Sequence, residues 1–77
     1  MRYYFDVDTD QFQTRDDEGC ELDNEAQMQC EARRVLARIA EDETRFAPRS
    51  ILSARVRDSF GTPVYRVVLT LEGQSLQ

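Results

Sequence analysis

Hydrophobic and polar residues alternate with a period of two in four stretches of the chain. In the first stretch, Tyr3, Phe5 and Val7 fall on one side and polar or amphipathic residues fall on the other. Aromatic and β-branched residues at this period are typical of a strand with one buried face. The predicted strands cover about residues 2–8, 11–15, 50–57 and 64–72.

Between the second and third predicted strands, the hydrophobic period lengthens to that of a helix. Its apolar residues fall within one arc of a helical projection, and charged residues fill the opposite side. Asp23 is the expected N-cap, and Pro48 disfavours helical backbone at the residue before it. The helix is therefore predicted over about residues 23–46. The apolar arc contains Met28, Ala32, Val35, Leu36, Ile39 and Phe46.

Two glycines mark predicted turns. Gly19 ends an acidic segment after the second strand and is free to adopt a positive φ. The run from Asp58 to Gly61 has Asp at the first and Gly at the fourth position of a β-turn, so it joins the last two strands. Residues 73–77 are expected to form a frayed tail.

The element order ββαββ predicts an α+β fold in a single domain over residues 1–77. We expect a single antiparallel four-stranded sheet with one long helix packed on one face. The strand at 64–72 is the most apolar, which favours a central position in the sheet. The predicted core consists of Tyr3, Phe5, Val7, Phe12, Leu22, Ala26, Ala32, Val35, Leu36, Ile39, Leu52, Ala54, Val56, Tyr65, Val67, Leu69 and Leu71.

The charge is acidic overall and unevenly distributed. The net charge is −5, with residues 1–31 contributing −8 and residues 32–77 contributing +3. An acidic chain has little general affinity for nucleic acid or for anionic membranes. The asymmetry is typical either of an acidic face that meets a basic partner or of two halves that offset each other. No apolar run is long enough to cross a membrane, and we expect no secretory signal.

Several residue types that catalysis uses are missing. The chain has no His, the commonest general base and metal ligand. Its three Gly form no phosphate-binding loop. Cys20 and Cys30 match neither a disulfide scaffold nor a zinc site, which favours free thiols in a reducing cytoplasm. We therefore expect no enzymatic activity and no cofactor.

Four acidic residues offer a weak calcium-binding pattern. Asp6, Asp8, Asp10 and Asp17 stand at positions 1, 3, 5 and 12 of a calcium loop. Against this, Gln11 occupies the position where the loop needs Gly, position twelve is Asp rather than Glu, and the flanks are predicted strands. An acidic hairpin tip is the simpler interpretation, and no metal site is expected.

The best candidate for a binding surface is a set of Arg residues on the predicted sheet. Arg55, Arg57 and Arg66, together with Tyr4, are expected on the face turned away from the helix. Such a face can anchor a protein partner or stack single-stranded nucleic acid. The alternative is a solvated face of spaced cations.

Three segments carry a resemblance to a known family. They are Arg-Tyr-Tyr-Phe-Asp-Val at residues 2–7, Asp-Asp-Glu-Gly-Cys-Glu-Leu at residues 16–22, and Val-Arg-Asp-Ser-Phe-Gly-Thr-Pro-Val at residues 56–64. Together they resemble a family of short, uncharacterised bacterial proteins classed only as a domain of unknown function. The resemblance implies the fold and no site residues. In outline, the architecture is also similar to HicB-type antitoxins.

These observations predict a small non-catalytic protein-interaction module that is homodimeric and cytoplasmic. A domain of this size is marginally stable alone, and oligomerisation is a common supplement. The alternatives are a nucleic-acid-associated regulator that uses the Arg-bearing sheet face, and a calcium-binding acidic hairpin.

Overall fold

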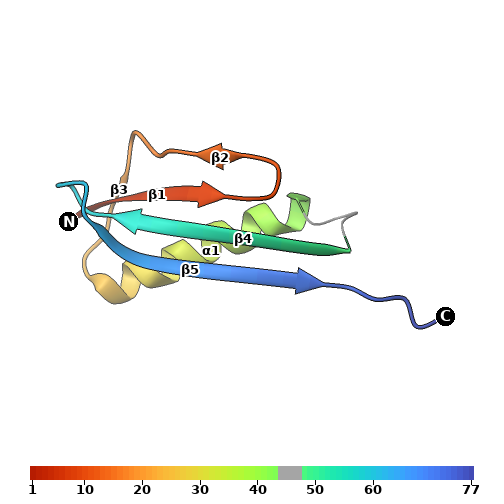
Figure 1. The fold of residues 1–77 in the computed structure, drawn as a ribbon. Helices are drawn as coiled ribbons and strands as arrows, with labels where there is room; N and C mark the ends of the chain where they lie inside the picture. The colour runs from red at the N-terminus through yellow and green to blue at the C-terminus, as the bar shows by residue number, and fades with distance from the viewer. Residues whose placement is uncertain (44–47) are drawn as a thin grey trace.

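The computed structural model describes residues 1–43 and 48–77 and confirms the α+β fold. One helix lies across one face of an antiparallel sheet, and the other face is open (Figure 1). No helix in the described part of the chain has the length and hydropathy needed to span a membrane. The elements are β1 (Arg2–Asp8), β2 (Gln13–Thr14), β3 (Cys20–Glu21), α1 (Glu25–Glu43), β4 (Arg49–Arg57) and β5 (Pro63–Glu72).

The sheet has the strand order β2-β1-β4-β5, and β3 pairs with the same outer edge of β1. The predicted central position of residues 64–72 is wrong, because β5 pairs only with β4 and forms an edge. The additional apolar residues that suggested a central strand do not lie in the interior. Val64 and Val68 point to the open face, where they are 43% and 48% exposed.

The predicted second strand is reduced to two residues. Thr9 organises the preceding turn: its amide donates to the Phe12 carbonyl at 2.9 Å, and its hydroxyl oxygen accepts from the Gln11 and Phe12 amides. Residues 11 and 12 therefore belong to a turn, and pairing begins at Gln13. The short strand β3 was not predicted, because two residues are too few to show a period.

The helix begins one residue later than its predicted cap implies. The side-chain oxygen of Asn24, not Asp23, accepts a hydrogen bond from the Gln27 amide at 2.9 Å. The Gln27 side chain accepts in return from the amide of Asp23, the residue before the cap, at 3.0 Å, so the two side chains satisfy one amide inside the first turn and one just before it. The predicted last turn at 44–46, including Phe46, lies outside the described residues.

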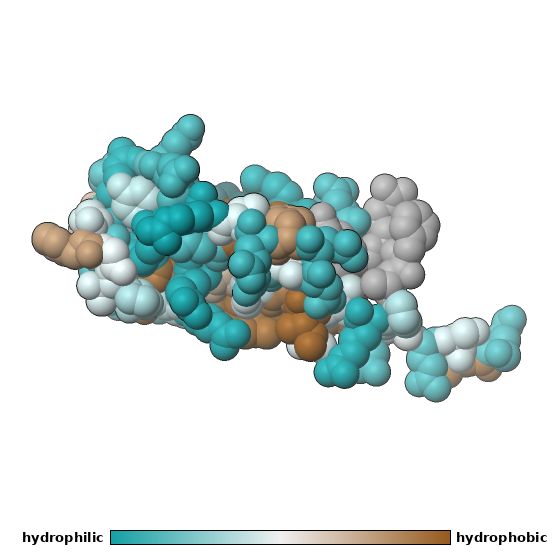
Figure 2. All heavy atoms as spheres, turned by 45° about the horizontal axis from the view of Figure 1, so that its top comes forward, coloured by the Kyte–Doolittle hydropathy of each residue, from teal (hydrophilic) through white to brown (hydrophobic). Residues whose placement is uncertain are grey.

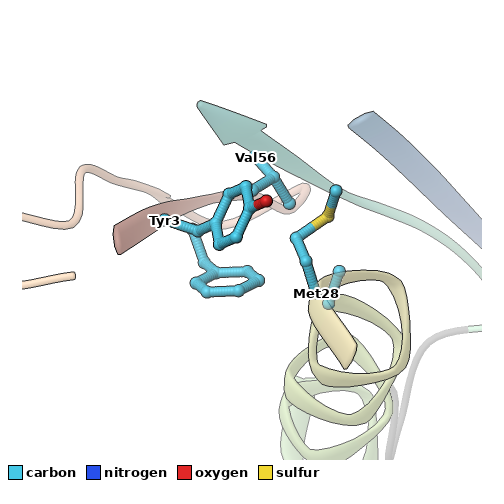
Figure 3. Close-up of a cluster of buried hydrophobic side chains, with 5 residues drawn as sticks. Tyr3, Met28 and Val56 are labelled. Carbon is cyan, nitrogen blue, oxygen red and sulfur yellow. The ribbon is translucent and has the colours of Figure 1, made fainter. Parts of the chain in front are cut away.

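The core between α1 and the sheet consists of two clusters of side chains. In the first, Met28 of α1 points towards Tyr3 and Val56 of the sheet (Figure 3). Ala32 and Ala54 are fully buried, and such small side chains let the helix approach the sheet closely. Two predicted core residues, Ala26 and Leu71, are exposed instead. The second cluster contains Val7, Leu36, Ala40, Leu52 and Ala54.

The β4–β5 hairpin closes through the predicted turn. The Gly61 amide donates to the Asp58 carbonyl at 3.0 Å, and Gly61 has a φ of 85°. The Asp58 carboxylate accepts from the amides of Phe60 and Thr62. The turn leaves Phe60 91% exposed at its tip.

Candidate functional site

The outer edge of β1 is closed by a side chain as well as by two short strands. Between β2 and β3, the Asp16 carboxylate accepts a hydrogen bond from the Phe5 amide at 3.1 Å. Its other oxygen accepts from the amides of Glu18 and Gly19 at 3.1 and 3.0 Å. Asp16 therefore takes the place of a carbonyl in the ladder and fixes the loop that follows β2.

Arg57 of β4 ties this loop to the open face of the sheet. Its Nε donates to Asp6 Oδ2 at 2.8 Å, and its Nη2 donates to Asp6 Oδ1 at 3.1 Å. The same Nη2 donates to the Asp16 carbonyl at 2.7 Å. The Arg57 side chain is only 13% exposed, so this bidentate ion pair is largely shielded from water.

The cluster holds both carboxylates in the charged form. The Arg57 guanidinium lowers the pKa of Asp6, and this effect outweighs partial burial, which raises it. Partial burial also raises the pKa of Asp16, but the hydrogen bonds from the Gly19, Phe5 and Glu18 amides lower it below its ordinary value. Neither group is suited to act as a general acid near neutral pH.

Two of the four predicted binding residues therefore serve the fold. The Arg57 guanidinium carbon lies 4.9 Å from the centre of the Tyr4 ring, so Tyr4 covers one side of the ion pair. Sequence reasoning missed Asp16 altogether. Its only signal was an acidic residue three positions before a turn glycine, and this pattern is common on surfaces.

The other two predicted binding residues, Arg55 and Arg66, face each other on neighbouring strands of the open face. Neither forms an ion pair within residues 1–43 and 48–77. They line an open hollow of about 300 Å³ together with Asp6, Asp8 and Ser53. Directly opposed like charges destabilise a sheet unless an anion lies between them.

Apolar side chains adjoin this Arg pair. Ile51 is 44% exposed on β4, and Val68 on β5 is paired with Ser53, two register positions from the Arg55–Arg66 pair. In Figure 2, a brown hydrophobic area lies in the lower middle of the view, bordered by teal hydrophilic side chains. We call Ile51, Arg55, Val64, Arg66 and Val68 the open-face patch.

The four acids of the calcium pattern do not converge. Asp6 is bound to Arg57, and Asp10 Oδ2 accepts a hydrogen bond from the Ile51 amide at 3.5 Å. Asp8 lines the hollow and Asp17 is exposed. In the part of the chain that the structure describes, no three His, Cys, Asp or Glu side chains lie close enough to hold a metal ion. Both cysteines are free thiols.

The family model for Domain of unknown function (DUF6894) matches residues 2–70. The chain belongs to this family. No curated protein and no solved structure matches it. The resemblance expected from the three sequence segments is thereby confirmed.

In this DUF6894 chain, the three segments meet at one place. The first contributes Asp6, the second Asp16 and the third Arg57, and these are the residues of the hydrogen-bonded cluster. The segments that carry the resemblance therefore hold β1, the edge loop and β4 together. Arg66 lies outside them, on β5.

Proposed function

We propose that the chain is a small non-catalytic interaction module, homodimeric, which binds a protein partner on the open-face patch. The opposition of Arg55 and Arg66 carries this proposal. Asp6 and Asp8 border this pair, but Asp6, the register partner of Arg55, is already bound to Arg57. A carboxylate of a partner would therefore supply a further anion to the two exposed cations.

The surroundings of the Arg pair indicate the chemistry of the partner. Ile51, Val64 and Val68 are each between 43% and 48% exposed on the same face. An interface with apolar side chains and an Arg anchor is typical of protein recognition. The partner would therefore present an acidic residue flanked by apolar ones. A reducing compartment such as the cytoplasm suits the two free thiols.

The same cations are the basis of the alternative, a nucleic-acid-associated regulator. Arg57 already covers one face of the Tyr4 ring, so only the other face could stack on a base. The net charge of −5 also opposes association with phosphate. The protein partner is accordingly the better supported of the two.

The test compares partner capture by tagged wild-type protein with capture by Arg55→Gln and Ile51→Thr variants. Arg34→Gln is the matched control, because Arg34 is an exposed cation on α1, remote from the sheet. We expect wild type and the control to capture the same nuclease-resistant protein, and the two patch variants to recover about a tenth of it or less.

Two outcomes would contradict the proposal. Equal capture by all four proteins would show that the partner binds elsewhere. Capture that vanishes with nuclease, combined with binding of single-stranded oligonucleotides at low salt, would favour the nucleic-acid alternative.

A further inference from the structure

The backbone of β5 is open along its outer side. β5 runs over ten residues and pairs only with β4. The opposite edge of the sheet is different, because β2, β3 and the Asp16 side chain cover β1. Natural edge strands are usually short, bulged or interrupted by Pro. β5 has Pro63 at its first position and a bulge at Val64, which has no register partner on β4, but both lie at one end, and the register from Tyr65 to Glu72 is regular.

We infer that a second copy of this chain covers the edge, through antiparallel pairing of β5 with β5 about a two-fold axis at Leu69. This register places Arg66 of each copy opposite Glu72 of the other, and Val68 opposite Thr70. Arg66 and Glu72 lie on the same face of β5, and neither forms an ion pair within the described residues, although Arg49 of β4 is the register partner of Glu72. The strand is therefore self-complementary in charge.

Two further observations favour the axis at Leu69 over its neighbours. It leaves Pro63, which has no amide donor, outside the paired segment. It also places Leu71, which is 47% exposed on the helix side, opposite Val67 of the other copy. An axis at Val68 would place Arg66 opposite Thr70, and an axis at Val67 would place it opposite Val68. Both leave the charges unmatched.

The pairing produces one continuous sheet with both helices on the same side and both open faces on the other. It specifies the homodimer of the proposed function and rests on it. It does not depend on the protein partner, because Arg55 lies on β4, one strand away from the new contact. A failure of dimerisation and a failure of partner binding can thus be told apart.

The experiment measures the dissociation constant of the purified full chain by analytical ultracentrifugation. Arg66→Glu and Glu72→Arg each create two symmetry-related like-charge contacts, and we expect each to raise the Kd about tenfold to a hundredfold. The double variant Arg66→Glu/Glu72→Arg restores opposite charges, and its Kd should return to within about threefold of wild type.

Arg34→Glu is the charge-reversal control, since Arg34 is exposed on α1, away from the β5 edge. Its Kd should equal that of wild type, and far-UV circular dichroism should show all variants folded. Arg66→Glu also removes the like-charge contact with Arg55, whereas Glu72→Arg places a cation opposite Arg49 of its own chain, so Arg66→Glu is the more decisive of the two single variants. A wild-type chain that stays monomeric at high concentration would overturn the inference. A Kd that neither single charge reversal raises would overturn it equally. So would a Kd that stays raised in the double variant.

Discussion

At the scale of single residues, the Asp6–Asp16–Arg57 cluster shows how side chains complete a small fold. Its hydrogen bonds link β1, the loop after β2, and β4, which are far apart in sequence. A chain of this size has little apolar surface to bury, so polar contacts that are shielded from water have a large share in its stability.

The cluster predicts a loss of stability in acid. The pKa of Asp16 is lower in the folded state than its ordinary value of 3.8, so the unfolded chain binds more protons around that pH. The stabilisation is complete well above pH 3.8 and is lost as the pH falls through the folded pKa. Asp16→Asn should therefore lower the free energy of unfolding at neutral pH, by about 1–3 kcal/mol.

Urea denaturation of both proteins at several pH values checks this prediction. The difference between wild type and Asp16→Asn should shrink as the pH falls below 3.8. A difference that is independent of pH would show that the charge of Asp16 contributes nothing.

The two turn glycines provide a matched pair of substitutions. Both have positive φ, but a Cβ at Gly19 would lie 2.9 Å from Tyr4 Cε1 and 3.0 Å from the Tyr3 carbonyl oxygen. A Cβ at Gly61 would meet nothing within 4 Å. Gly61→Ala should cost about 1 kcal/mol through backbone strain alone. Gly19→Ala should cost about 1–3 kcal/mol more through overpacking, and equal melting temperatures for the two variants would refute this.

The predictability of single residues depends on how local their role is. The positive φ of Gly19 and Gly61 follows from the turn pattern around each. Arg55, Arg57 and Arg66, in contrast, are equivalent in the sequence. Only the strand register separates Arg57, which is bound to Asp6, from the exposed pair that forms the candidate site.

At the scale of elements, β1, β4 and the helix were predictable because their hydrophobic periods are regular and long. The alternation of Tyr3, Phe5 and Val7 corresponds to buried positions of β1. The edge position of β5 was not predictable, because apolar residues on both of its faces are typical of a central strand. The apolar residues on its second face are the open-face valines, which belong to the candidate site rather than to the core.

The start of α1 provides a test at this scale. Asp23 and Asn24 are equally good N-cap residues in isolation, and only the structure shows that Asn24 accepts from the Gln27 amide. Asn24→Ala should lower the free energy of unfolding by about 1 kcal/mol. Asp23→Ala should change the free energy of unfolding by a few tenths of a kcal/mol at most. Thermal denaturation of the two variants checks this, and a larger loss for Asp23→Ala than for Asn24→Ala would contradict it.

At the scale of the whole molecule, stability and assembly are linked. If β5 edges pair, the melting temperature of wild type should rise with protein concentration, because association stabilises only the folded state. The Arg66→Glu/Glu72→Arg variant should behave in the same way. For Arg66→Glu the melting temperature should be nearly independent of concentration over the same range, and differential scanning calorimetry measures all three.

The Asp16 carboxylate at the edge of β1 also limits how large an assembly can become. A sheet with two free edges can add strands on both sides and grow into a fibre. Here an additional strand could pair with β1 only after the hydrogen bond from the Phe5 amide to the Asp16 carboxylate had been broken. If β5 edges pair as proposed, strands could be added from that side only, and the pairing would cover that edge in both copies. The hydrogen-bonded loop at β1 would then make a closed dimer, rather than a polymer, the end point of self-association.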